Sequence, residues 1–270
     1  MSPHSRFLFV ALAIAFASSA LAADPAALVA AKRQLQAGVS HAKPEEILRA
    51  KASFAALLAA EPESAALNYW IALADWRAEP IVLRTDRDEA KKLCKEGIAA
   101  CDRALAAKPK MADAIALKAS LQGLSLTFAP SAGMTLGPEM DEAFGRAEGM
   151  DADNPRVVLF KAIGTMHKPK FVNGGPDRAK PQFEHALALF ERAPAADSTA
   201  IDWGHDDAFL WSGQCLGQLG DWRGARGRYR RALALNPDNA WVQYVLLPQA
   251  EKALAAKPDS TSQARKADQP

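Results

Sequence analysis

Apolar residues recur at helical spacing along almost the whole chain. The sequence is rich in Ala and Leu, it has few runs of Val, Ile and Thr, and no stretch alternates between apolar and polar residues as a half-buried strand does. Ala and Leu are also among the strongest helix formers. The pattern therefore predicts an all-α protein.

The expected helices follow one another closely. A leading helix is predicted near 24–37 and a second near 44–60, and helix pairs follow at 65–107, 112–150, 155–192 and 206–235. A last helix at 240–255 is expected to cover the exposed end of the stack. The chain then divides into a leader at 1–22, N-terminal helices at 23–64, a helical repeat domain at 65–255 and a polar tail at 256–270 that is expected to be disordered.

The predicted helices contain an internal repeat. An aromatic or small residue is followed by Ala, by an apolar pair and, in most copies, by a helix-ending Pro, in segments that begin at Phe54, Cys101, Phe144 and Tyr229. A fifth segment, at Phe183, lacks the Pro. The fullest copy lies between Asp206 and Asn239 and carries Gly213, Ala225, Tyr229, Ala232 and Pro237.

This pattern resembles the tetratricopeptide repeat (TPR) family, whose unit is a pair of antiparallel helices with small residues where the two helices touch. In the last copy the small residues are Gly213, Ala225 and Ala232, Tyr229 fills the space beside them, and Pro237 ends the unit. The equivalent small residues elsewhere are Ala72, Ala119 and Ala162 on first helices and Ala104, Ala147 and Ala186 on second helices. The resemblance implies a right-handed α-solenoid of helix pairs.

The copies are more widely spaced than the family's usual repeat of about 34 residues. The additional residues fall at 77–86, 127–138, 167–176 and 193–204, where longer helices or loops are expected. The combination of Asn154-Pro155, the Asn-Gly-Gly at 173–175 and Trp203-Gly204-His205 resembles a group of exported bacterial repeat proteins. That resemblance implies a scaffold and specifies no activity.

The N-terminus reads as an export signal. Arg6 precedes the apolar run Phe7–Phe16, and Ala20-Leu21-Ala22 matches a signal peptidase site. The run is shorter than the roughly 20 apolar residues that span a membrane. A Sec-type signal peptide cleaved between Ala22 and Ala23 is expected, with a periplasmic or secreted product that does not insert stably into a membrane. An uncleaved anchor is the alternative.

Charge and cysteine content narrow the possible partners. Lys and Arg number 33 against 31 Asp and Glu, so the sequence has no electrostatic signature of nucleic-acid binding. Cys94 and Cys101 would lie about 10 Å apart along one helix, which exceeds the Cα separation of about 7 Å that a disulfide tolerates. Three buried thiols are expected, and a bond from either residue to Cys215 stays open.

No constellation predicts catalysis, a cofactor or a metal. The sequence lacks a nucleophile elbow, a zinc-protease helix and a P-loop. Asp202, His205, Asp206 and Asp207 cluster, but consecutive residues cannot all face one ion, and Asp206 or Asp207 is better explained as an N-cap or first-turn acid. The glycines at 173–176 are expected to adopt positive φ in a turn that precedes a helix starting at Pro176.

The remaining candidate site is the groove that first helices line in the TPR family. The candidate groove residues are Tyr69, Leu73, Trp76, Asp113, Arg156, Leu159, Ile163, Met166 and Gln214. Exposed aromatic and Arg residues favour peptide capture, so the leading hypothesis is a non-catalytic scaffold for a protein or peptide partner.

Two alternatives remain open for this groove. Tyr69 and Trp76 could instead pack against a neighbouring loop. The protein could also be a small-molecule carrier, whose inserts would close a pocket lined by Phe128, Phe171 and Trp203. An open trough would favour the scaffold, and an enclosed apolar pocket would favour the carrier.

Overall fold

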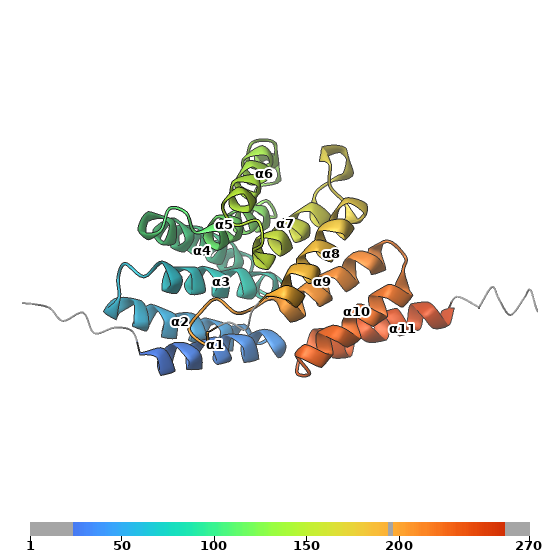
Figure 1. The fold of residues 1–270 in the computed structure, drawn as a ribbon, viewed down its shortest axis with the longest axis horizontal. Coiled ribbons are helices and arrows are strands. Elements are labelled where there is room, and N and C mark those ends of the chain that lie inside the picture. Colours follow the sequence, from blue (N-terminus) through green and yellow to red (C-terminus); the bar gives the residue numbers. More distant parts are fainter. Residues whose placement is uncertain (1–23, 194–196, 257–270) are drawn as a thin grey trace, which may run out of the picture.

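The computed structural model describes residues 24–193 and 197–256, and the signal peptide expected at 1–22 and the tail from 257 onward lie outside them. All regular elements in this part of the chain are helical (Figure 1). They are α1 (Pro25–Ser40), α2 (Pro44–Ala60), α3 (Ala65–Val82), α4 (Arg87–Ala107), α5 (Ala112–Ser125), η1 (Pro130–Ala132), α6 (Gly133–Met150), α7 (Pro155–His167), η2 (Lys170–Val172), α8 (Pro176–Arg192), α9 (His205–Gln218), α10 (Trp222–Leu235), η3 (Val242–Leu246) and α11 (Leu247–Ala256).

Consecutive helices pack as pairs, α1 with α2, α3 with α4, α5 with α6, α7 with α8, and α9 with α10 (Figure 1). The π-helical segment η3 and α11 pack on α10 and cover the last pair. The pairs stack side by side into an all-α solenoid, which confirms the fold class predicted from the sequence.

Local residues set the helix boundaries. The side chains of Asp24, Ser64, Asp86, Asn154 and Asp221 accept hydrogen bonds from backbone N–H groups at the starts of α1, α3, α4, α7 and α10. These bonds satisfy donors that the first helical turn leaves free. Pro occupies an opening position of α1, α2, α7 and α8, where its missing N–H costs nothing. The helix starts are thus encoded locally.

Small residues lie where helices meet. Ala72, Ala104, Ala119, Ala147, Ala162, Ala186, Ala225 and Ala232 are all buried. Gly213 is packed so tightly that a Cβ there would lie 2.5 Å from Cε1 of Tyr229. Pro237 is exposed in the turn that follows α10.

The inserts between repeats take several forms. Residues 77–86 mostly lengthen α3, 127–138 form η1 and the start of α6, and 167–176 contain η2. The segment 197–204, which leads into α9, contains no helix. This last segment packs on Tyr69 and Trp76, two of the predicted groove residues.

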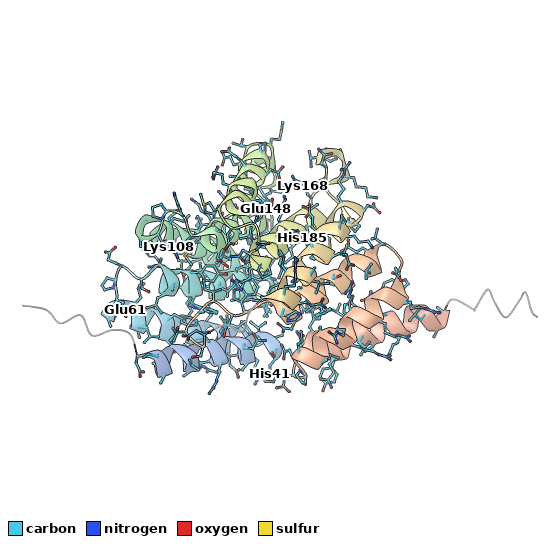
Figure 2. All side chains as sticks on the ribbon, viewed as in Figure 1. His41, Glu61, Lys108, Glu148, Lys168 and His185 are labelled. Carbon is cyan, nitrogen blue, oxygen red and sulfur yellow. The ribbon has the colours of Figure 1, made fainter. Side chains whose placement is uncertain are left out.

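The two ends of the solenoid touch. The Asn236 side chain at the end of α10 donates a hydrogen bond to Ser40 Oγ, 3.1 Å away at the end of α1, and another to Asp206 at 2.8 Å. His41, which caps α1, marks this junction at the lower edge of Figure 2. The stack therefore curls until its first and last pairs meet.

The three cysteines are free and buried, as expected. Burial raises the pKa of the Cys94 thiol to about 12 and that of Cys215 to about 11, so both stay protonated at neutral pH. Among residues 24–193 and 197–256, no helix combines the length and the apolar character needed to cross a membrane.

Candidate functional site

The apolar residues predicted to line an open groove lie in the core. Tyr69, Leu73, Trp76, Leu159, Ile163 and Met166 are each at most 7% exposed. Asp113, Arg156 and Gln214 are partly exposed. The structure therefore corrects the expectation of an exposed aromatic groove on α3 and α7.

The segment 197–204 instead covers the face formed by these residues of α3 and α7, which we call the concave surface. The Trp203 indole donates a hydrogen bond from Nε1 to the Tyr69 hydroxyl at 2.9 Å, and its ring centroid lies 6.2 Å from that of Trp76 and 5.3 Å from that of Phe160. Burial is the main cause that raises the pKa of Tyr69 well above its usual value. The alternative in which Tyr69 and Trp76 pack against a neighbouring loop is the arrangement observed.

A buried ion pair crosses the same surface. The Arg77 guanidinium of α3 donates to both carboxylate oxygens of Asp207 on α9, at 2.7 and 2.5 Å. Its carbon also lies 5.0 Å from the ring centroid of Trp76 and 4.7 Å from that of Trp203. Burial lowers the pKa of Arg77, but the charge of Asp207 more than offsets this effect, so the net shift is upward. This pair ties the second helix pair to the fifth.

A lysine of α1 holds the other end of the segment. Lys32 Nζ donates to the carbonyl oxygens of Ser198 and Ala200 at 2.6 and 2.8 Å and pairs with Asp202 at 2.7 Å. Its ammonium also lies 5.2 Å from the centroid of the Trp70 ring. Within the residues that the structure describes, the concave surface is filled by the chain itself.

The acidic cluster around the start of α9 has structural partners. Asp202 pairs with Lys32, Asp206 accepts from Asn236, and Asp207 pairs with Arg77. Asp206 and Asp207 lie in the first turn of α9, as predicted, whereas Gly204 occupies the N-cap. No group of three or more His, Cys, Asp or Glu side chains suited to a metal ion occurs in the described ranges.

The turn before α8 differs in detail from its prediction. Positive φ occurs at Asn173 (62°) and Gly175 (105°), and Pro176 begins α8 as expected. Gly174 is needed for another reason, because a Cβ there would lie 2.1 Å from the Lys168 carbonyl oxygen. The turn is therefore shaped by close packing as well as by positive φ.

The aromatic residues of the carrier hypothesis do not meet. Trp203 is buried on the concave surface, Phe171 is 89% exposed, and Phe128 lies under the Arg87 guanidinium, 5.1 Å from it. None of the three lines either of the two hollows that follow. The pocket predicted from these residues is wrong.

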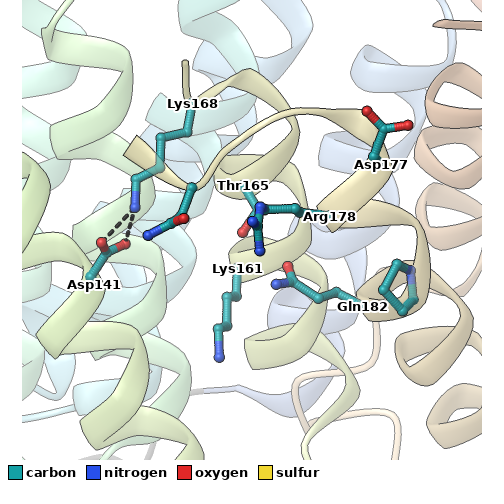
Figure 3. A pocket seen from close by; sticks show the side chains of 9 residues that line it. Asp141, Lys161, Thr165, Lys168, Asp177, Arg178 and Gln182 are labelled. Carbon is teal, nitrogen blue, oxygen red and sulfur yellow. Dashed lines mark hydrogen bonds and ion pairs between the residues drawn. The ribbon is translucent and has the colours of Figure 1, made fainter. Parts of the chain in front are cut away.

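An open hollow lies between α6 and the α7–α8 pair, and we call it the α6 cleft (Figure 3). The second helices α2, α4 and α8 pack closely on the first helix of the next pair, but α6 packs only weakly on α7, because α5 contacts α7 directly. The cleft has a volume of about 480 Å³. It is lined by Asp141, Lys161, Thr165, Lys168, Asn173, Asp177, Arg178, Pro181 and Gln182.

Two ion pairs connect α6 to the other side of this cleft. Lys161 pairs with Glu148 and Lys168 pairs with Asp141, both at 2.5 Å. Figure 2 labels Glu148 on α6 and Lys168 at the end of α7, on the two sides of the cleft. These ion pairs add to the limited packing of α6 on α7.

Asp177 in the α6 cleft pairs with Lys170 at 3.3 Å, whereas two other polar side chains keep groups without a partner. The Arg178 side chain makes no ion pair or hydrogen bond with the described residues, and it reaches toward Thr165 in the middle of the cleft (Figure 3). The Gln182 amide oxygen is buried without a hydrogen-bond partner. The cleft thus offers one cation without a partner, whereas the Gln182 oxygen is closed off from solvent, and none of the lining residues was predicted from the sequence.

A second hollow of about 530 Å³ lies at the opposite end of α7. It is lined by Asp151, Asp153, Asn154, Pro155, Arg156, Leu189, Arg192, Ala193 and Ile201. Arg156, predicted as a groove residue, pairs there with Asp113 at 2.7 Å, and Asn154 donates to the same carboxylate at 2.8 Å. Asp113 and Arg156 therefore pair with each other, whereas the Arg178 side chain has no ion-pair partner among the described residues.

No family model and no curated protein matches the sequence. Solved structures do resemble the fold. The HusA haemophore from Porphyromonas gingivalis is 21% identical with a TM-score of 0.53, and the match covers 68% of this chain and 92% of HusA. TTC0263, a thermophilic TPR protein of Thermus thermophilus, is 15% identical with a TM-score of 0.54, over 83% of this chain and 99% of that protein. The helix pairs, their small contact residues and these likenesses together show that the chain has a TPR-like fold.

Proposed function

We propose that this chain is a non-catalytic scaffold that holds a protein or peptide partner in the cell envelope. The observation that carries the proposal is the α6 cleft, an open hollow on a TPR-like stack whose lining includes the unpaired Arg178 side chain. Repeat stacks of this kind present extended surfaces to partners. The partner therefore docks on the outside of this solenoid.

The chain itself covers the concave surface, which supports a docking site on the outside of the solenoid. Tyr69, Trp76 and Arg77 already contact the chain's own Trp203, Ser120 and Asp207 through their polar groups, so these groups are not available to a partner. The connection beside the α6 cleft instead exposes Phe171 to 89% and Val172 to 43%. Exposed aromatic side chains of this kind are typical anchors at protein interfaces.

Crosslinking in intact cells tests the scaffold function. A photoreactive residue at Phe171 is expected to capture one defined protein, whereas the same residue at exposed Lys91 on α4 captures none. Equal capture from the two positions, or none from Phe171, would count against the proposal. The captured protein must also bind the purified chain in a separate assay.

The envelope location depends on the signal peptide expected at 1–22. Cleavage between Ala22 and Ala23 would leave the described helices intact, because α1 begins at Pro25. N-terminal sequencing of protein from the periplasmic or secreted fraction is expected to begin at Ala23. Protein that retains residues 1–22 and stays in the cytoplasm would refute this location.

A small-molecule carrier is the second candidate. HusA, which shares this fold, is a haemophore, and a volume of about 480 Å³ falls within the range of small-molecule sites. Native mass spectrometry of protein purified from its natural source, together with haemin titration followed by absorbance, separates the two functions. A retained small molecule or a saturable shift of the haemin spectrum would favour the carrier.

A further inference from the structure

The helical segment that ends the stack carries an apolar stripe that faces solvent. Trp241, Tyr244 and Val245 are 40%, 71% and 51% exposed, and Pro248 is exposed as well. Their spacing of three and four residues places them on one side of the segment, and we call this surface the end stripe. The opposite side is buried against α10. An apolar stripe with this spacing normally packs on another element of the protein.

The two ends of the stack differ in this respect. Among the described residues, eight large apolar side chains are exposed, and three of them lie within 241–245. The helices α1 and α2, at the other end of the stack, expose none (Figure 1). The terminal elements of a repeat stack need a polar outer face for solubility. The first end therefore suits contact with water, whereas the last end requires a cover.

The end stripe contains a fixed anchor and an unusual backbone. The Trp241 ring packs edge-on against Trp211 of α9, with 6.1 Å between the ring centroids and an angle of 74° between the planes. An aromatic side chain that is held in place in this way loses little freedom when a partner binds. Residues 242–246 form a π-helical turn, a rare conformation that is frequent at functional sites.

The charges beside the end stripe suit a copy of the same surface. Residues 240–256 contain one acidic and one basic residue, Glu251 and Lys252. Glu251 also pairs with Arg230 of α10 at 3.3 Å. Anionic lipid and nucleic acid attract clusters of Lys and Arg, and this segment has no such cluster. Two identical segments meet without a net charge of like sign, and Glu251 of one copy can pair with Lys252 of the other.

We propose that two copies of this chain pair through the end stripe in a two-fold symmetric dimer. Every folded copy exposes the stripe, so the cover must be present wherever the chain is, and a second copy meets this condition. The tail at 257–270 contains no large apolar residue to cover the stripe. Because α1 and α2 expose no apolar partner surface, the contact pairs like with like and closes at two copies. The dimer presents two α6 clefts.

The size of the end stripe limits the strength of the dimer. A standard interface buries about 800 Å² per partner, and a Trp or Tyr residue supplies at most about 250 Å². Trp241, Tyr244 and Val245 are partly buried already, so the interface must include the neighbouring side chains of Gln249 and Lys252. We therefore expect a dimer of moderate affinity that dissociates on dilution.

Sedimentation equilibrium of the chain that begins at Ala23 tests the dimer. Protein concentrations from about 1 µM to about 1 mM cover moderate and weak affinities. The mass is expected to reach that of two chains within this range and to stop there. A mass of one chain at every concentration would overturn the proposal. A mass that rises past two chains would also overturn it, because it indicates an open head-to-tail contact.

Matched variants locate the contact. Tyr244→Glu is expected to weaken the dimer at least about tenfold, because it places a charge among apolar side chains. Met134→Glu adds the same charge at a 90% exposed position on α6 and leaves the dimer unchanged. Equal losses in both variants would show non-specific association and refute the site. Val245→Glu repeats the test if circular dichroism shows that Tyr244→Glu is unfolded.

Crosslinking in intact cells distinguishes a second copy from another protein. A photoreactive residue at Tyr244 is expected to produce a crosslinked pair of this chain. Capture of a different protein alone would overturn the proposal and assign the end stripe to that protein. The outcome is independent of the scaffold function, because that function is tested from Phe171 on the connection beside the α6 cleft.

Discussion

Contacts between a glycine and an aromatic ring set the spacing within the last helix pair. Tyr229 on α10 packs onto the bare backbone of Gly213 on α9. The opposite case occurs at Gly227 on the same α10, where an added Cβ would have no neighbour within 4 Å. The two positions therefore form a matched pair for testing the packing.

Gly213→Ala is expected to lower the free energy of unfolding by about 1–3 kcal/mol, because the new methyl group collides with a buried ring. Gly227→Ala is expected to raise it by about 0.5–1 kcal/mol through helix propensity. Urea denaturation of both variants measures the difference. An unchanged midpoint for Gly213→Ala would show that Tyr229 relaxes freely.

Asp207→Ala is expected to cost about 3–5 kcal/mol, because it leaves the buried Arg77 without its counter-charge. Glu142→Ala removes the partner of Arg146 from an exposed pair and is expected to change stability by less than about 1 kcal/mol. Chemical denaturation compares the two. Similar small losses would mean that water replaces Asp207 around the guanidinium.

Glu79 predicts a pH dependence of stability. Its carboxyl group is buried in α3, and burial raises its pKa from 4.5 to about 7. The folded state therefore holds this proton more tightly than the unfolded state, so the contribution is complete below pH 4.5 and is lost as pH rises through 7. Glu79→Gln keeps the shape and removes the titration.

The advantage of Glu79→Gln over the unaltered chain is expected to grow by about 2–3 kcal/mol between pH 4.5 and pH 8. Thermal unfolding across this range measures it. Glu139→Gln, at an exposed site on α6, is the control and should follow the unaltered chain at every pH. A constant difference for Glu79→Gln would indicate a packing effect instead of titration.

Among the helices, α6 is the exception in the stack. Three glycines without contacts, Gly137, Gly145 and Gly149, lie in this one helix, which packs weakly on α7. The sequence predicted a helix pair at 112–150, and α5 and α6 confirm it. That α6 turns away from α7 was not predicted, because the direction of a helix depends on which neighbour its apolar face meets.

The double variant Gly137→Ala and Gly145→Ala is expected to stabilise the protein by about 1–2 kcal/mol in total, because neither methyl group meets a neighbour. Circular dichroism during thermal unfolding measures the gain. A loss of stability would mean that α6 needs these glycines for its path.

Across the entire solenoid, contacts between distant repeats set this protein apart from an open array. In such an array each repeat contacts only its neighbours, and stability is a sum of local terms. Here Arg77 joins α3 to α9, and Asn236 joins α10 to the end of α1. We therefore expect the curled stack to unfold as one cooperative unit.

Hydrogen exchange followed by mass spectrometry is expected to give α2 and α10 the same free energy of opening in low concentrations of urea. Asp207→Ala removes one cross-link, so α2 and α10 should then open at different urea concentrations. Separate opening of the two helices in the unaltered chain would show that the distant contacts contribute little to cooperativity.

The helices, their pairing and the small residues at their contacts could be predicted from the amino-acid sequence. These features depend on helical spacing and on neighbours within one repeat, as at Gly213 for the approach of Tyr229. The same spacing could not decide whether Tyr69 and Trp76 face solvent, because an apolar stripe looks alike whether a partner or the chain itself covers it.

The candidate sites, in contrast, are products of the three-dimensional arrangement. Curvature accumulates from small rotations over successive helix pairs, and it brings Asp207 within 2.7 Å of Arg77 across 130 positions of sequence. It also places Trp203 over Tyr69 and closes the concave surface. The divergence of α6 opens the cleft around Arg178 and Gln182. Each result depends on contacts between residues far apart in the chain, which no local pattern encodes.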